Sequence, residues 1–102
     1  MQRGNLFVYV PVITRPGISI LRLIVSSDTI NNSEIPWVLG VHLLESDPGS
    51  LLAPRIGDHG WAVVTTIERV MKSRLGEQTG LATPEELHQV DIALRAALGL
   101  DV

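Results

Sequence analysis

The sequence predicts a mainly β domain that ends in one α-helix and folds as a small barrel or a coiled antiparallel sheet. Short apolar runs rich in β-branched residues are separated by Gly, Pro and Asn turns at close spacing, which is typical of such architectures. The last part of the chain changes to a helical period and carries capping residues at both ends. The 102 residues are 45% hydrophobic, which is enough for one core and predicts a single domain over residues 1–102.

Two strands are predicted near the start of the chain. Leu6–Val10 contains β-branched and aromatic residues, which favour extended structure. The Arg-Pro-Gly sequence at 15–17 predicts a turn, because Pro fixes φ at the first central position and Gly accepts positive φ. Ile18–Val25 then alternates apolar with small or polar residues, as a strand does. One face of this strand is predicted to carry Ile18, Ile20, Arg22 and Ile24.

The middle of the chain adds four more short β segments. Residues 26–36 are rich in Asn, Ser and Asp and predict a loop. The apolar run Trp37–Leu44 predicts a central strand, and a short strand is expected over Leu51–Ile56. Two further stretches follow, over Trp61–Thr66 and Ile67–Met71. With the first two, they make six predicted strands.

The C-terminal segment predicts a helix over residues 84–98. Thr83 is a suitable N-cap, with a Pro at the first helical position and Glu86 at the third, which together make a capping box. Apolar side chains then recur at helical spacing, and Gly99 occupies the position of a C-cap glycine. This apolar stripe either packs on a barrel formed by residues 5–80 or, in part, serves a dimer.

The formal net charge of −3 conceals an uneven distribution. Residues 1–27 hold three Arg and no Asp or Glu, whereas residues 28–102 hold eleven acidic residues against five basic ones. Seven of the eight cations are Arg, whose guanidinium group can bind a phosphate bidentately. The distribution therefore indicates an N-terminal end that faces an anion.

Several classes of site and location are excluded or disfavoured. The absence of Cys excludes disulfides, thiolate nucleophiles and Cys-based zinc sites. His42, His59 and His88 are scattered over different predicted elements, so we expect no metal site and no cofactor. The apolar runs are far shorter than the ~20 residues needed to span a bilayer, and the opening residues do not form a targeting signal. We therefore expect a cytoplasmic protein that does not enter membranes.

Arg22 is the most informative single residue, because a charge inside an apolar strand is costly to bury. It is either a solvated or salt-bridged residue on the outer barrel face or, with Arg15, a clamp for a phosphate. His42, inside its apolar run, is either a hydrogen-bonded core or interface residue or a catalytic base. A second basic group either extends the phosphate-binding groove or forms solvated surface; it comprises Arg69, Lys72 and Arg74.

Segments along much of the chain resemble the MazF/PemK/Kid toxins. The opening MQRGN at 1–5 resembles their RGD/RGE start, and LIVSSD at 23–28 resembles their second strand and VSND corner. VMKSRLG at 70–76, followed by TPEEL at 83–87, is similar to their KSRLG…L(S/T)PEEL stretch. Residues 90–100 continue this similarity as VDxAL…LGL.

Other segments are similar to the related CcdB toxins, which share the same fold. RLIV at 22–25 resembles their RLFV, and IGDHGW at 56–61, followed by TT at 65–66, resembles their IGDxxW…TT. CcdB toxins poison DNA gyrase through a WGI sequence at the end of the terminal helix, and this chain has no Trp there. A gyrase-binding protein is therefore the alternative function.

The resemblance implies a small SH3-like β-barrel with a C-terminal helix that works as a homodimer. It also implies the toxin component of a type II toxin–antitoxin system, neutralised by a cognate antitoxin. In the MazF branch the implied activity is that of an mRNA interferase, a metal-independent endoribonuclease that cleaves single-stranded RNA at selected sequences. A third possibility is a degenerate toxin that only binds its antitoxin.

An Arg in the second strand and a later Thr or Ser carry the chemistry in MazF toxins. Here the Arg position falls on Ile20, and Arg22 lies two residues further along the same strand face. The Thr position falls near Leu44, and Ser46 lies two residues beyond it. We therefore predict Arg22, Ser46 and His42 as catalytic residues. The predicted RNA-binding residues are Arg15, Arg3, Arg69 and Lys72.

Overall fold

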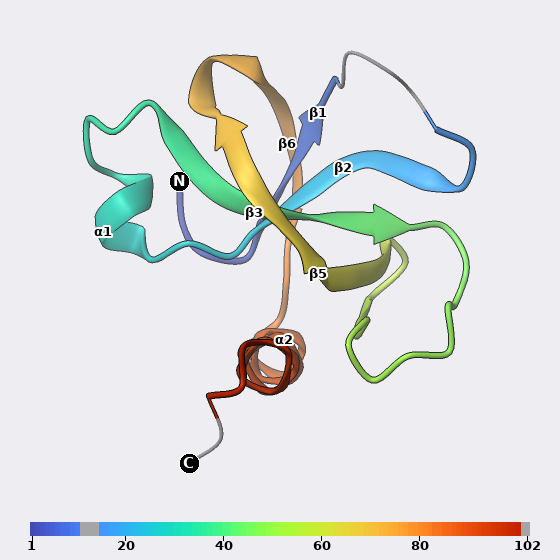
Figure 1. The fold of residues 1–102 in the computed structure, drawn as a ribbon. Helices are drawn as coiled ribbons and strands as arrows, with labels where there is room; N and C mark the ends of the chain where they lie inside the picture. Colours follow the sequence, from blue (N-terminus) through green and yellow to red (C-terminus); the bar gives the residue numbers. More distant parts are fainter. Residues whose placement is uncertain (11–14, 101–102) are drawn as a thin grey trace.

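The computed structural model describes residues 1–10 and 15–100 and shows a curled antiparallel sheet with one long C-terminal helix (Figure 1). The sheet has six strands in the order β4-β5-β3-β2-β1-β6, and each described pair of neighbours is antiparallel. The elements along the chain are β1 (Asn5–Tyr9), β2 (Ile18–Ile24), α1 (Asp28–Asn31), β3 (Trp37–Leu44), β4 (Arg55–Ile56), β5 (Gly60–Met71), the 3-10 turn η1 (Lys72–Arg74), β6 (Leu75–Leu81) and α2 (Pro84–Leu98). The predicted fold class is confirmed.

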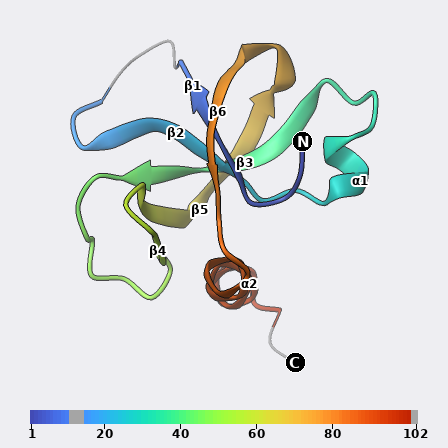
Figure 2. The ribbon, with the colours of Figure 1, turned by 180° about the vertical axis from the view of Figure 1, so that it is seen from behind.

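Helix α2 packs against one face of the curled sheet, as the two opposite views show (Figures 1 and 2). Its residues Val90 and Ala93 are buried in a core that they share with Leu6, Leu23 and Val41 of three strands. A second, smaller core is formed by strand residues whose side chains point to the opposite face of the sheet. It consists of Tyr9, Ile24, Val38 and Val70. Both faces of the sheet are therefore partly covered.

The ends of α2 have the caps that the sequence predicts. Thr83 Oγ1 accepts a hydrogen bond from the Glu86 backbone N–H at 3.1 Å, and the Thr83 N–H donates to Glu86 Oε1 at 2.8 Å. Gly99 takes the left-handed conformation at φ 68°, which ends the helix without a steric cost. In the described part of the chain, no helix is long and apolar enough to cross a membrane.

Two of the predicted strands are one, and a strand that the sequence pattern does not indicate completes the sheet. Residues 61–71 belong to the continuous strand β5, which pairs with β3 along most of its length. The sixth strand is β6, whose central residues are exposed and polar. Because β6 lies at the sheet edge and pairs with β1, long-range hydrogen bonds rather than local apolar alternation hold it.

The loops also differ from expectation in two places. The strand predicted over Leu51–Ile56 shortens to β4, although the carbonyl groups of Leu52 and Pro54 still accept hydrogen bonds from β5. Pro54 has no N–H to return, so a regular ladder cannot extend past it. The predicted 26–36 loop contains the short helix α1, which Ser27 caps by accepting a hydrogen bond from the Ile30 N–H.

Candidate functional site

One carboxylate contacts two of the three predicted catalytic residues, which lie on neighbouring strands. Arg22 on β2 lies directly opposite His42 on β3 in the sheet register. Glu68 Oε1 on β5 lies 3.3 Å from Arg22 Nε and 2.8 Å from His42 Nε2. We call these three residues the Arg22–Glu68–His42 cluster. It has a cation, an acid and an imidazole on one face of three adjacent strands.

An irregularity in β5 brings Glu68 to this position. Gly40 pairs with Glu68 and His42 pairs with Val63, so two steps along β3 correspond to five along β5. Within the extra segment, Thr66 Oγ1 accepts a hydrogen bond from the His42 backbone N–H at 2.8 Å and donates to the Val63 carbonyl at 2.7 Å. The bulged strand therefore turns Glu68 toward the histidine, in the way that bulges re-aim side chains in other sheets.

The Arg22 side chain is buried, with only 4% of its surface exposed. Its Nη1 donates to the carbonyl oxygens of Ser19 at 3.0 Å and Leu21 at 2.9 Å, and its guanidinium group lies 5.3 Å from the ring centre of Tyr9. A buried cation needs such partners because desolvation is costly. Arg22 is therefore salt-bridged inside the sheet, and its charge acts on the site through Glu68.

His42 is the half-buried imidazole of the cluster, between the buried Arg22 and the more exposed Glu68. Its side chain is 23% exposed. A carboxylate can only accept hydrogen bonds, so the contact with Glu68 requires a hydrogen on His42 Nε2. In the neutral ring this leaves Nδ1 unprotonated. The arrangement can therefore accept a proton at Nδ1 while Glu68 stabilises the imidazolium that forms.

A second guanidinium group lies close to the cluster. Arg74 in η1 lies 4.6 Å from the ring centre of Tyr9, the same ring that Arg22 contacts, and its Nη2 donates to the Val10 carbonyl at 2.7 Å. Unlike Arg22, Arg74 is exposed. It can therefore attract an anionic ligand to the face that carries His42.

Ser46 and Arg15 lie away from the cluster. Ser46 is exposed two residues beyond the end of β3, and four residues beyond His42. Arg15 is exposed in the turn that precedes β2, and the Glu45 N–H donates to the Gly17 carbonyl at 3.0 Å. The two turns therefore meet at the end of the sheet where β2 begins and β3 ends. Among the described residues, the hydrogen bonds of the Arg22 side chain go to Ser19, Leu21 and Glu68, and none goes to Arg15 or Ser46.

The other predicted RNA-binding residues are dispersed. Arg3 pairs with Asp91 of α2 at 2.6 Å and donates from Nε to the Val25 carbonyl at 2.9 Å. Lys72 Nζ donates to the Ser33 carbonyl at 2.7 Å, just after α1. Arg69 is exposed and its guanidinium lies 5.0 Å from the ring centre of Trp37.

Arg69 and the cluster point to opposite faces of the sheet. Arg69 pairs with Leu39, one position away from the Gly40–Glu68 pair, and successive side chains along a strand alternate between faces. The predicted basic group is thus divided, and of its three members Arg74 shares the aromatic ring of Arg22.

Sequence reasoning missed Glu68 and Tyr9 as site residues. One feature of the sequence could have pointed to Glu68 as a partner for a cation. It is the only acid between Thr65 and Gly76, in a segment with three basic residues. The bulge in β5 hides the alternation that places Glu68 on the face of Arg22. Tyr9 looks like any core aromatic in the sequence, and only the two guanidinium contacts distinguish it.

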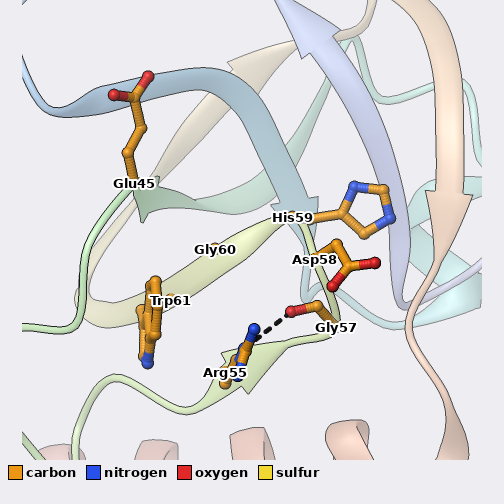
Figure 3. A pocket seen from close by; sticks show the side chains of 7 residues that line it. All are labelled: Glu45, Arg55, Gly57, Asp58, His59, Gly60 and Trp61. Carbon is orange, nitrogen blue, oxygen red and sulfur yellow. Dashed lines mark hydrogen bonds between the residues drawn. The ribbon is translucent and has the colours of Figure 1, made fainter.

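A separate pocket of about 270 Å³ lies at the hairpin that joins β4 and β5 (Figure 3). Arg55 lies over the Trp61 ring, 5.3 Å from its centre, and its Nε donates to the Gly57 carbonyl at 3.0 Å. None of the predicted site residues lines this pocket, which is bounded by Glu45, Arg55, Gly57, Asp58, His59, Gly60 and Trp61.

Solved structures of several toxins and endoribonucleases share this architecture. An endoribonuclease from Mycobacterial species superposes with a TM-score of 0.82 at 24% identity, over 97% of this chain and 91% of that one. An endoribonuclease in complex with its cognate antitoxin, also from Mycobacterial species, gives 0.78 at 25% identity, with 100% and 96% coverage. The MazE–MazF complex (Form-I) from Deinococcus radiodurans gives 0.75 at 19% identity, with 97% and 96% coverage.

Comparison of the sequence alone with known families and curated proteins gives no match. The structural matches nevertheless extend over nearly all of the chain and of each matched protein. The chain therefore has the MazF/Kid/CcdB toxin fold, as its sequence motifs predict.

Proposed function

We propose that this chain is the toxin component of a type II toxin–antitoxin system and cleaves single-stranded RNA. The observation that carries the proposal is the partly exposed imidazole of His42, held by an acid on a fold shared with endoribonucleases. Two of the three structures named above are complexes with an antitoxin, which supports neutralisation of this chain by a cognate antitoxin. We also propose that the active form is a homodimer.

The chemistry requires no group beyond the RNA, solvent and these side chains. The 2′-oxygen attacks the adjacent phosphorus as its proton passes to His42 Nδ1, and the bond from phosphorus to O5′ breaks. O5′ takes up a proton from solvent, and the imidazolium later returns its proton to solvent. The products are a 2′,3′-cyclic phosphate and a 5′-hydroxyl end. General-base catalysis of this kind contributes roughly 10²–10⁴-fold to a rate.

The cationic groups have separate tasks in this scheme. Arg74 is exposed beside the cluster and contacts the phosphate, whose negative charge grows in the transition state. Arg22 is buried and holds Glu68. Arg15 and Ser46, at the far end of the same two strands, contact neighbouring nucleotides rather than the reacting atoms.

The test is a cleavage assay with purified protein and single-stranded transcripts, in which primer extension maps the new 5′ ends. Cleavage at a limited set of positions, with 5′-hydroxyl ends, is expected for the wild-type chain. His42→Ala should reduce the rate by at least about 10²-fold. His88→Ala, a change of an exposed histidine on α2, is the matched control and should cleave normally.

The same preparation distinguishes the alternative functions. Intact RNA together with inhibited supercoiling by DNA gyrase would replace the proposal with a gyrase-binding toxin. Intact RNA and active gyrase, with retained antitoxin binding, would identify a degenerate toxin.

A further inference from the structure

We infer that Glu68 is a positioning residue, which holds His42 with Nδ1 free to act as the base and is itself held by Arg22. The inference rests on the proposed function for its kinetic consequence, but the position of the proton on His42 is a property of the protein alone. It also changes the role of Arg22, from a group that touches phosphate to one that acts through Glu68.

The hydrogen-bond geometry carries the first step. One oxygen, Glu68 Oε1, contacts both Arg22 Nε and His42 Nε2, at 3.3 Å and 2.8 Å. Both partners must donate, because an ionised carboxylate has no hydrogen to give. The neutral imidazole therefore carries its hydrogen on Nε2, and Nδ1 keeps its lone pair.

The fixed position of Arg22 carries the second step. Its Nη1 is tied to the Ser19 and Leu21 carbonyl groups, and its guanidinium group lies on the Tyr9 ring. These contacts anchor a buried cation beside a carboxylate whose own side chain is 41% exposed. These contacts give a partly exposed acid a defined orientation, as in the carboxylates that orient a catalytic or metal-bound histidine.

The partial exposure of both His42 and Glu68 indicates that their contact does more than stabilise the fold. His42 and Glu68 are both partly exposed, and pairs of this kind contribute little to stability. Their short contact is better explained by control of the imidazole ring, since the same contact stabilises the imidazolium after proton uptake. The consequence lies in the rate of the chemical step rather than in RNA affinity.

The first test is nitrogen-15 NMR of the full chain, with the His42 resonances assigned by comparison with His42→Ala. We expect an Nε2-bound hydrogen that exchanges slowly with water in the wild-type protein. In Glu68→Gln, which keeps the shape but loses the charge, this hydrogen should exchange faster. Glu77→Gln, at an exposed acid of β6, is the matched control and should leave the His42 signal unchanged. A neutral ring in the wild-type protein that carries its hydrogen on Nδ1 instead of Nε2 overturns the inference, whether or not RNA is cleaved.

The second test is single-turnover RNA cleavage by the same variants. Glu68→Gln should slow cleavage by about 10–100-fold with unchanged RNA affinity, the range found for carboxylates that orient metal-bound histidines in the same way. Glu68→Asp keeps the charge and should recover part of the loss, and it carries the comparison if the Gln variant fails to fold. Wild-type rates for folded Glu68→Gln overturn the inference. A wild-type chain that cleaves no RNA refutes the proposed function and leaves the NMR test standing.

Discussion

Arg22 of β2 and His42 of β3 lie directly opposite each other, and one oxygen of Glu68 lies within hydrogen-bonding distance of both. The three residues come from three strands and are separated by up to 46 positions in the chain. Their exposure increases from the buried arginine to the accessible acid. The cluster therefore has a buried end at Arg22 and a solvent-facing end at Glu68. Substitutions at these two residues should consequently differ in their effect on the free energy of unfolding.

Removing the acid should destabilise the protein more than removing the cation. Glu68→Ala leaves the Arg22 charge buried with only backbone carbonyl groups and the Tyr9 ring, and we expect a loss of about 2 kcal/mol in the free energy of unfolding. Arg22→Met leaves an acid that reaches water, with an expected loss of roughly 1 kcal/mol. Urea denaturation of both variants measures the difference, and a larger loss for Arg22→Met contradicts the interpretation.

The salt dependence of RNA affinity should distinguish Arg74, which we propose contacts RNA, from Arg3, which is paired with Asp91 within the protein. In the inactive His42→Ala background, Arg74→Gln should reduce the slope of log affinity against log salt by about 0.7, the value for one lost contact to a single strand. Arg3→Gln should leave the slope unchanged, because Arg3 is paired with Asp91 on α2. Equal effects of the two changes would show that the surface around Arg74 has no special part in binding.

The cap of α2 should make a measurable contribution to stability. Thr83→Ala removes the hydroxyl that accepts a hydrogen bond from the Glu86 N–H, which should cost about 1 kcal/mol. Glu85→Gln changes an acid in the same turn that takes no part in the capping box, and serves as the control. Thermal and urea melts should show the larger loss for Thr83→Ala.

A substitution at Gly60 should strongly destabilise the fold. This residue has φ 123°, and a Cβ there meets the Leu44 carbonyl oxygen of the neighbouring strand at a distance too short for any real contact. Gly60→Ala should therefore cost at least about 3 kcal/mol. Gly17→Ala also requires positive φ but opens into free space, and should cost about 1 kcal/mol. Similar melting temperatures for the two variants would contradict the close approach of Gly60 to Leu44.

The predictable parts of the fold are those decided by short stretches of chain. The capping box from Thr83 to Glu86 and the C-cap at Gly99 depend on side chains and backbone angles within one or two turns. Strand β6 was not predictable in this way, because its exposed polar centre has no apolar alternation. The single continuous β5 and the short β4 likewise depend on pairing with distant strands and on the missing N–H of Pro54.

Arg22 and His42 could be predicted from the sequence as candidate site residues. The carboxylate of Glu68, which links them, could not. A charge and an imidazole inside apolar strands are visible as exceptions in the sequence. Glu68 was not predictable because a bulge in β5 shifts the strand register between Val63 and this residue. Ser46, which the family resemblance predicts as a catalytic residue, lies two residues beyond the end of β3.

The amino-acid sequence is enough to predict a mainly β chain with a capped C-terminal helix, its toxin-like motifs, and the unusual positions of Arg22 and His42. The folded chain adds that Arg22 is buried against Glu68 and that Arg74 shares its aromatic ring. It also shows that Arg3 pairs with Asp91 and that Lys72 bonds to the Ser33 carbonyl. The difference arises because the neighbouring residues in the sequence show that burying a charged side chain would be costly, but not which group compensates for it. The partner depends on strand register and curvature, which arise from hydrogen bonds between segments far apart in the chain.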